Sequence, residues 1–465
     1  MSVSTAATES PVCAPLPVLG RDVRVPLVTG EEVVYAALDY AASAPALQRV
    51  WDEVAAYAPY YGSVHRGAGY LSQLSTDLFE ASRREVADFL GCRADDQVVF
   101  TRSTTDSLNL LAAALPVGTR AFVFETEHHA ALLPWGRRAD LAVTCLPAPR
   151  SHREAVETLE RALAAREPHG PALVCVTGAS NVTGELWPVR ELAAAAHAHG
   201  ARIVLDAAQL APHHPVDTAG WDVDWVAFSG HKLYAPFGAG VLAGRADWLR
   251  DAEPYLAGGG ASRSVTRRAD GGVDVEWHTG AARHEAGSPN VIGAYAIAAA
   301  CRALTEAGFR NLVAHEQDLI DRVRKGLAEV PGVRVLSLFD EEPGSATPSR
   351  VGVISFVVEG WNSSHFAAAL SAEYGIGVRD GLFCAHPLVR TLLGADPGEP
   401  GECGAPDAPA GGRRLDAIRV SFGAGTPREH VERFTAAVRE LVRDGARGSY
   451  RTENGRCVPD WAERD

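Results

Sequence analysis

Residues 202–240 read RIVLDAAQLAPHHPVDTAGWDVDWVAFSGHKLYAPFGAG, and this stretch decides the fold class. Two apolar runs within it, RIVLDAA and DWVAFSG, are each followed by polar side chains, among them Asp206 and Lys232. Near-continuous apolar strands that alternate with helices are typical of a parallel sheet covered on both faces. Ligands of such sheets bind beyond the carboxyl ends of the strands, so Asp206 and Lys232 are predicted to share one rim.

Five more short apolar runs surround this pair and alternate with helical segments. The seven predicted strands are 97–101, 120–125, 141–147, 172–178, 202–208, 224–230 and 238–245. The sequence therefore predicts the α/β class, with a mostly parallel seven-stranded sheet.

The C-terminal part has a different pattern, which predicts a smaller α+β domain. Its expected elements are a long helical stretch 292–330, strands 334–338 and 351–359, a helix 364–374, a strand 417–423 and a final helix. The spacing of Thr426 and Glu429 predicts a capping box at the start of that last helix. The expected organisation is an N-terminal segment 1–35, a large domain 36–300, a small domain 301–445 with a Gly/Pro-rich loop 393–413, and a polar tail 446–465.

Charge and composition exclude several classes of protein. The 465 residues include 44 basic and 58 acidic ones, a net charge of −14 without a basic stripe, which argues against nucleic acid or an anionic membrane as partner. No apolar run approaches the roughly 20 residues of a transmembrane helix, and the N-terminus lacks signal-peptide features, so a cytoplasmic location is expected. The eight cysteines contain no C-x-x-C pair, which argues against a disulfide framework or a zinc site, and no metal is predicted.

Lysine is scarce in this chain. Only Lys232 and Lys325 occur beside 42 arginines, so a retained lysine is a candidate for Schiff-base chemistry that a guanidinium cannot perform. Lys325 lies on an amphipathic helix and is expected to face solvent. Lys232 together with Asp206 fits pyridoxal phosphate, because the lysine bonds the cofactor and the acid keeps its pyridine nitrogen protonated. The alternative is an aspartate that caps a helix and a surface lysine.

Eight motifs follow one another along the chain: SVHRGAGYLS (63–72), TRSTTDSLN (101–109), ETEHHA (125–130), ASNVTGELWPV (179–189), VLDAAQ (204–209), FSGHKLYAPFGAG (228–240), EAGSPN (285–290) and RDGLFCAHPL (379–388). With them, residues 38–427 resemble the class V, fold-type I pyridoxal-phosphate enzymes, in particular the cysteine desulfurases and selenocysteine lyases of the sulfur-assembly type. The resemblance implies a fold-type I large domain with a smaller C-terminal domain.

The resemblance also implies roles around the cofactor ring. Lys232 matches the lysine that forms the Schiff base, and Asp206 matches the partner of the pyridine nitrogen. Gln209 matches the residue that bonds the phenolic oxygen, and Asn181 matches a polar residue near the same edge and the substrate. His128 matches an imidazole that stacks on the ring and can transfer protons.

For the phosphate, the resemblance implies contacts from the chain itself and from the second subunit of a homodimer. These residues are Thr104, Thr105, Ser229 and His231 and, from the partner subunit, Gly287 and Ser288. A Ser/Thr run that precedes a helix also suits a phosphate group by its own chemistry, although an N-cap alone is the alternative.

Three further positions match the family around the substrate. Arg419, in a strand of the second domain, matches the residue that clamps the substrate α-carboxylate, and a structural ion pair is the alternative. His129 is expected to be structural. His65 and Arg66 match positions near the entrance of the site.

Cys384 distinguishes between reactions. It preserves the R-x-G-x-x-C-A frame of the sulfur-accepting cysteine, but Leu382 and Phe383 stand where related proteins commonly have histidines, which leaves less thiolate. The leading hypothesis is a cysteine desulfurase that converts L-cysteine to L-alanine, forms a persulfide on Cys384 and passes sulfur to an acceptor protein. The alternatives are a pyridoxal-phosphate aminotransferase, lyase or epimerase of specialised metabolism, or a non-catalytic dinucleotide-binding scaffold. The glycine run 238–244 superficially suggests a nucleotide-binding loop, but it lies within an apparent strand and not between a strand and a helix. The presence of Lys232, Asp206 and His128 also argues against a non-catalytic scaffold.

Overall fold

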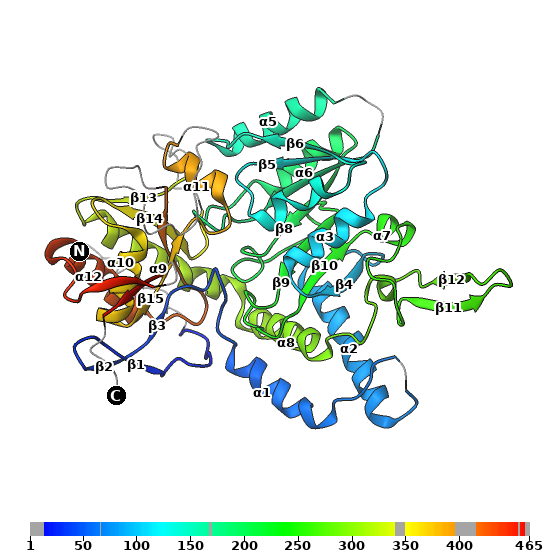
Figure 1. The fold of residues 1–465 in the computed structure, drawn as a ribbon, viewed down its shortest axis with the longest axis horizontal. Helices are drawn as coiled ribbons and strands as arrows, with labels where there is room; N and C mark the ends of the chain where they lie inside the picture. Colours follow the sequence, from blue (N-terminus) through cyan, green and yellow to red (C-terminus); the bar gives the residue numbers. More distant parts are fainter. Residues whose placement is uncertain are drawn as a thin grey trace, which may run out of the picture.

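A computed structural model describes residues 14–65, 67–166, 170–339, 349–395, 415–453 and 456–460. A larger part contains the seven-stranded sheet, and a smaller part contains the C-terminal helices α9, α10 and α12 (Figure 1). Arg66 and most of the predicted loop 393–413, from residue 396 on, lie outside the described residues. The predicted domain boundaries stay a prediction.

The central sheet has the strand order β4-β10-β9-β8-β7-β5-β6. Its strands are β4 (Gln97–Thr101), β5 (Arg120–Phe124), β6 (Ala142–Leu146), β7 (Ala172–Thr177), β8 (Arg202–Asp206), β9 (Trp225–Ser229) and β10 (Gly240–Gly244). The strands from β9 to β6 run parallel, and β10 is antiparallel to both of its neighbours. All seven predicted strands and the α/β class are therefore confirmed.

Helices cover both faces of this sheet because its strands are apolar on both sides. Along β5, Phe122 and Phe124 face one core cluster, whereas Ala121 and Val123 face the other. The helices and 3-10 turns of this part are α1 (Gln48–Tyr57), η1 (Ala58–Tyr60), α2 (Tyr70–Phe89), α3 (Thr104–Ala114), α4 (His129–Leu132), η2 (Pro134–Arg137), α5 (His152–Ala164), α6 (Val189–Ala198), α7 (Asp247–Asp251), η3 (Ala281–His284) and α8 (Val291–Ala307).

The smaller part packs three helices on a four-stranded sheet of order β13-β14-β17-β16. Its elements are α9 (Phe309–Ala328), β13 (Val333–Val335), β14 (Val353–Val358), α10 (Ser363–Tyr374), β15 (Ile376–Gly377), β16 (Arg379–Gly381), α11 (His386–Leu392), β17 (Ala417–Ser421) and α12 (Arg428–Asp444). Phe356, Phe366 and Phe434 form edge-to-face ring contacts in its core. β3 (Ala36–Ala37) pairs with β15, so the chain just after the predicted N-terminal segment contacts this part.

Three hairpins complete the chain. They are β1 (Arg24–Pro26) with β2 (Glu32–Val34), β11 (Ser262–Arg267) with β12 (Val273–Trp277), and β18 (Tyr450–Glu453) with β19 (Arg456–Pro459). The β11–β12 hairpin projects from the larger part at the right of Figure 1. The β18–β19 hairpin lies within the predicted polar tail. It is attached to α10, because the Tyr450 hydroxyl donates to Glu373 at 2.7 Å.

The predicted helical stretch 292–330 is present and is divided into two helices, because Gly308 adopts a φ of +79° between α8 and α9. Another sequence-based expectation about helices was wrong. The predicted capping box does not form: α12 begins after Pro427 without a side-chain cap, and the Thr426 hydroxyl accepts the Gly423 N–H at 3.2 Å instead. Within the described ranges, no helix combines the length and the apolar character needed to cross a bilayer.

Candidate active site

A cavity of about 420 Å³ lies beyond the carboxyl ends of the sheet strands, where the two parts of the molecule meet. Its walls contain eleven of the residues singled out from the sequence: Thr104, Thr105, His128, Asn181, Asp206, Gln209, Ser229, His231, Lys232, Cys384 and Arg419. These residues come from seven separate stretches of chain, and the fold brings them to one place.

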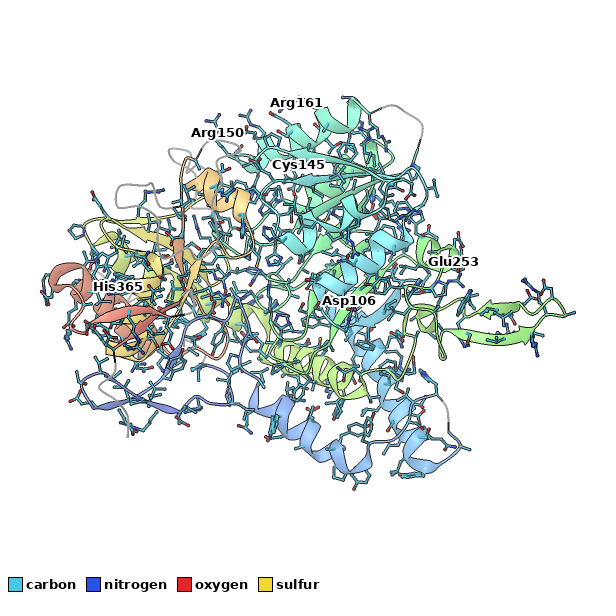
Figure 2. The ribbon with its side chains drawn as sticks, in the orientation of Figure 1. Asp106, Cys145, Arg150, Arg161, Glu253 and His365 are labelled. Carbon is cyan, nitrogen blue, oxygen red and sulfur yellow. The ribbon has the colours of Figure 1, made fainter. Side chains whose placement is uncertain are left out.

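One end of the cavity is built on the N-terminus of α3. Ser103 caps the helix by accepting the Asp106 N–H at 3.3 Å, and Asp106 marks this turn near the middle of the molecule in Figure 2. The Thr104 N–H and hydroxyl both bond the Ser229 hydroxyl at 2.7 Å, which joins the helix start to the end of β9. A helix N-terminus lined with hydroxyl groups binds phosphate well, since its N–H groups and dipole favour an anion.

Gly240 makes this arrangement possible. It lies in β10 opposite both Thr101 of β4 and Ser229 of β9. A Cβ atom at Gly240 would lie 2.6 Å from the Ser103 Cα, closer than any real Cβ contact, and backbone cannot move aside as a flexible side chain does. The start of α3 therefore requires glycine at this position.

Lys232 and Asp206 share the floor of the cavity. Asp206 ends β8 and pairs in register with Ala227 of β9, and Lys232 follows the end of β9. Burial lowers the pKa of Lys232 to about 8, although the Asp206 carboxylate opposes that shift. Burial likewise raises the pKa of Asp206, against the Ala208 N–H that it accepts at 2.9 Å. An amine with a lowered pKa suits Schiff-base formation, and the aspartate would gain from a further cation within the cavity.

His128 caps the short helix α4. Its Nδ1 accepts the Ala130 N–H at 3.0 Å, so the neutral ring carries its proton on Nε2. Burial, with the nearby charge of Lys232, lowers the pKa of His128 to about 3. The ring is therefore neutral at physiological pH. His129 is not among the residues that line the cavity, and its ring centroid lies 4.5 Å from that of His386.

The two side-chain amides of the cavity are buried and already hold backbone segments. The Gln209 Nε2 donates to the Ala41 carbonyl at 2.8 Å, and the Asn181 Nδ2 donates to the Phe383 carbonyl at 2.8 Å. Both residues therefore hold backbone segments that line the cavity.

Arg419 forms an ion pair and also lines the cavity. Its NH2 group lies 3.0 Å from Asp39, and its NH1 group donates to the Asn181 carbonyl at 3.1 Å. Its buried Nε has no hydrogen-bond partner among the described residues. The ion pair that was the alternative role of Arg419 is thus present, and the guanidinium still has N–H groups, among them that of Nε, without a partner in the described part of the chain.

Cys384 lies on a tight turn at the rim of the cavity, with its side chain exposed. The Ala385 N–H donates to the Leu382 carbonyl at 2.9 Å and closes the turn, and Phe383 and Cys384 both have a φ of +53°. Non-glycine residues rarely adopt such angles, and where they do the surrounding structure holds them.

Sequence reasoning assigned no role to Arg379 and Asp380, which also line the cavity. The signal was present, since both belong to the motif that contains Cys384. Their neighbours across the sheet are less apparent from sequence: Arg379 pairs in register with Arg419.

Gly287, Ser288 and His65 do not line this cavity. Gly287 and His65 line a separate groove of about 970 Å³, and Ser288 is exposed beside it. The Nε2 of His65 lies 3.0 Å from Glu80. A single chain therefore does not bring these residues to the cavity. No group of three or more potential metal ligands occurs in the part of the chain that the structure describes.

The cavity fits pyridoxal phosphate by the chemistry of its donors. It offers a helix N-terminus with hydroxyls for a phosphate, a buried acid for a pyridine nitrogen, and a lysine with a lowered pKa for an aldehyde carbon. The family model for aminotransferase class V matches residues 36–434. The chain thus belongs to the class V aminotransferase family, whose members depend on pyridoxal phosphate.

Cysteine desulfurases are among the members of this family that the chain resembles. A cysteine desulfurase of Yersinia pestis is 35% identical over 386 residues, which cover 81% of this chain and 89% of the relative. The solved cysteine desulfurase of Thermococcus onnurineus has a TM-score of 0.74 and 31% identity, covering 88% of this chain and 95% of that one. For the cysteine desulfurase CsdA of Escherichia coli, with the same two coverages, the TM-score is 0.72 and the identity 29%.

Proposed function

We propose that this chain is a cysteine desulfurase that converts L-cysteine to L-alanine and holds the removed sulfur as a persulfide on Cys384. The relatives named above support the activity. The observation that carries the proposal is that an exposed thiol, Cys384, lines the same cavity as Lys232 and Asp206.

The residues that would hold pyridoxal phosphate are those whose chemistry matches its three ends. Thr104, Ser229 and their neighbours at the start of α3 would bind the phosphate, Asp206 the pyridine nitrogen, and Lys232 the aldehyde carbon. Bound there, the cofactor would supply an electron sink for bonds to the substrate α-carbon.

The other side chains would orient the substrate and move its protons. The Arg419 guanidinium, which has an unpartnered Nε, would bind the substrate carboxylate. Lys232, whose pKa is lowered to about 8, can accept a proton near the α-carbon when it is in its neutral form. Neutral His128 carries a proton on its Nε2 and can donate a hydrogen bond from it to the substrate.

The sulfur step itself balances without an added oxidant. The Cys384 thiolate attacks the substrate sulfur, so a sulfur–sulfur bond forms as the substrate carbon–sulfur bond breaks. The electron pair of the broken bond stays with the carbon, which takes up a proton to give alanine. A thiol of an acceptor protein would then take the outer sulfur of the persulfide by exchange. Because this chemistry needs reduced thiols, we infer a cytoplasmic setting.

The active unit would be a homodimer with shared sites. Gly287 and Ser288 are exposed on a loop away from the chain's own cavity, so a second copy is the natural recipient of their contacts. In that arrangement Ser288 would reach the phosphate of the partner subunit's cofactor.

Two experiments test the proposal. Borohydride reduction of the holoenzyme should fix the cofactor on the peptide that contains Lys232, and Lys325, the other lysine, is the internal control. Incubation with L-cysteine should yield alanine and, with a reductant, sulfide in equal amounts. Another product from another amino acid, with no alanine from cysteine, would contradict the desulfurase activity.

A further inference from the structure

The Cys384 turn is held from outside itself at three points. The Asn181 amide donates to the Phe383 carbonyl at 2.8 Å, and the His129 backbone N–H donates to the Cys384 carbonyl at 2.8 Å. The third point is the Phe383 ring, which is buried although its residue has a left-handed backbone. A buried ring and a carbonyl bond keep Phe383 in a conformation that it would otherwise leave.

The Phe383 ring lies against the guanidinium of Arg419. The Arg419 Cζ is 4.9 Å from the ring centroid, within the range of a cation–π contact. The same guanidinium also donates hydrogen bonds to Asp39 and to the Asn181 carbonyl. Asn181 therefore touches Arg419 through its carbonyl and Phe383 through its side chain, so one cluster connects the guanidinium to the turn.

We propose that Phe383 is a positioning residue that couples the substrate-carboxylate site at Arg419 to the Cys384 thiol. Its ring face holds the guanidinium, and its left-handed backbone holds the turn that presents the thiol. The part that Phe383 plays in sulfur transfer rests on the proposed function. Its contacts with Arg419 and Asn181 do not depend on that function.

The chemistry of the ring is essential to this role. An aromatic face attracts a cation, whereas an aliphatic side chain of similar volume fills the space without that attraction. Cys384 is also close enough to Lys232 and Arg419 to interact with both charges. A turn that relaxed would move the thiol away from these two side chains and change its exposure at the rim of the cavity.

The test compares Phe383→Leu and Phe383→Met, which lack the ring face, with Phe383→Tyr, which keeps it. Two quantities are measured on each holoenzyme: the dissociation constant of L-alanine, and the rate at which iodoacetamide alkylates Cys384, read on its peptide. Without the ring we expect the dissociation constant to rise about tenfold. We expect Cys384 alkylation to slow about threefold, because the turn would no longer hold the thiol exposed at the rim. Phe383→Tyr should restore both values to within about twofold of the wild type.

Phe309→Leu is the matched control, since Phe309 packs against Phe89 and does not line the cavity. The proposal fails if both ring-less variants match the wild type, if only one of the two quantities changes, or if Phe383→Tyr is as impaired as Phe383→Leu. Circular dichroism identifies a variant that does not fold. If one ring-less variant does not fold, the other one tests the proposal. Failure of the proposed function is distinct, because it appears in the wild type as no persulfide on Cys384 after L-cysteine.

Discussion

At the scale of single residues, the site depends on side chains whose ionisation the fold has shifted. Lys232 is buried beside Asp206, and burial dominates over that attraction, so its pKa falls to about 8. The same burial raises the pKa of Asp206. A bound pyridinium would stabilise the buried Asp206 carboxylate. A bond between Lys232 and the cofactor would remove the free-energy cost of a buried lysine ammonium. Both residues are therefore better accommodated in the holoenzyme than in the cofactor-free protein.

The lowered pKa of Lys232 predicts a pH dependence of the cofactor-free protein. The unfolded chain keeps the lysine proton up to the ordinary lysine pKa of 10.5, whereas the folded protein releases it near 8, so between these values the unfolded state binds more protons. The free energy of unfolding should therefore rise with pH across this window, by at most about 3 kcal/mol. Urea unfolding of wild type and Lys232→Met at about pH 7 and about pH 9.5 measures it. An identical pH dependence in the two proteins would contradict the shift.

At the scale of the elements, the sequence predicted most of what positions the site. All seven sheet strands were visible as apolar runs, and their polar ends supplied Asp206 and Lys232. The partner of Arg419 was not predictable, because Asp39 is 380 residues away and meets it only through the fold. The left-handed backbone of Phe383 was equally hidden, since no glycine or asparagine marks it. Gly308 did offer a signal for the break between α8 and α9.

The junction of β4, β9 and β10 with α3 allows a sharp test of the phosphate cradle. Gly240→Ala places a Cβ 2.6 Å from the Ser103 Cα and must displace the start of α3. Loss of one or two hydrogen bonds to a charged phosphate should weaken cofactor binding about tenfold to hundredfold. The dissociation constant of pyridoxal phosphate measures the effect.

Gly136→Ala serves as the control for that substitution, because nothing lies within 4 Å of a Cβ at Gly136. Its cofactor affinity should equal that of the wild type. Equal affinities in all three proteins would show that the start of α3 does not bind the phosphate.

At the scale of the whole molecule, one chain holds two separate parts of the proposed chemistry. The cavity contains Lys232, Cys384 and Arg419, whereas Gly287 and Ser288 lie on another surface. The Arg83–Glu285 ion pair, 2.8 Å between Nη1 and Oε1, fixes the segment just before Gly287 to α2. This loop is thus held in place by its own chain and available to a second copy.

Shared sites predict complementation between two defective subunits. Ser288→Ala should weaken cofactor binding about tenfold, since it removes a hydrogen bond to a charged group. In a heterodimer of Lys232→Arg with Ser288→Ala, one site would combine an intact Lys232 with an intact Ser288 from the other subunit. At limiting cofactor, the mixed dimer should therefore exceed both parent homodimers in activity. A mixture no more active than the Ser288→Ala protein, or a fully active monomer by sedimentation, would contradict the shared site.

The most direct measurement of the central claim is mass spectrometry of the Cys384 peptide, together with an alanine assay, after a single exposure to L-cysteine without reductant. The wild type should gain one sulfur atom on Cys384 and release one alanine for each sulfur bound. Cys384→Ala removes the nucleophile and leaves Lys232, Asp206 and Arg419 in place, so it should bind cofactor and cysteine but form little alanine and no protein persulfide. Undiminished alanine production by Cys384→Ala would contradict sulfur transfer through Cys384.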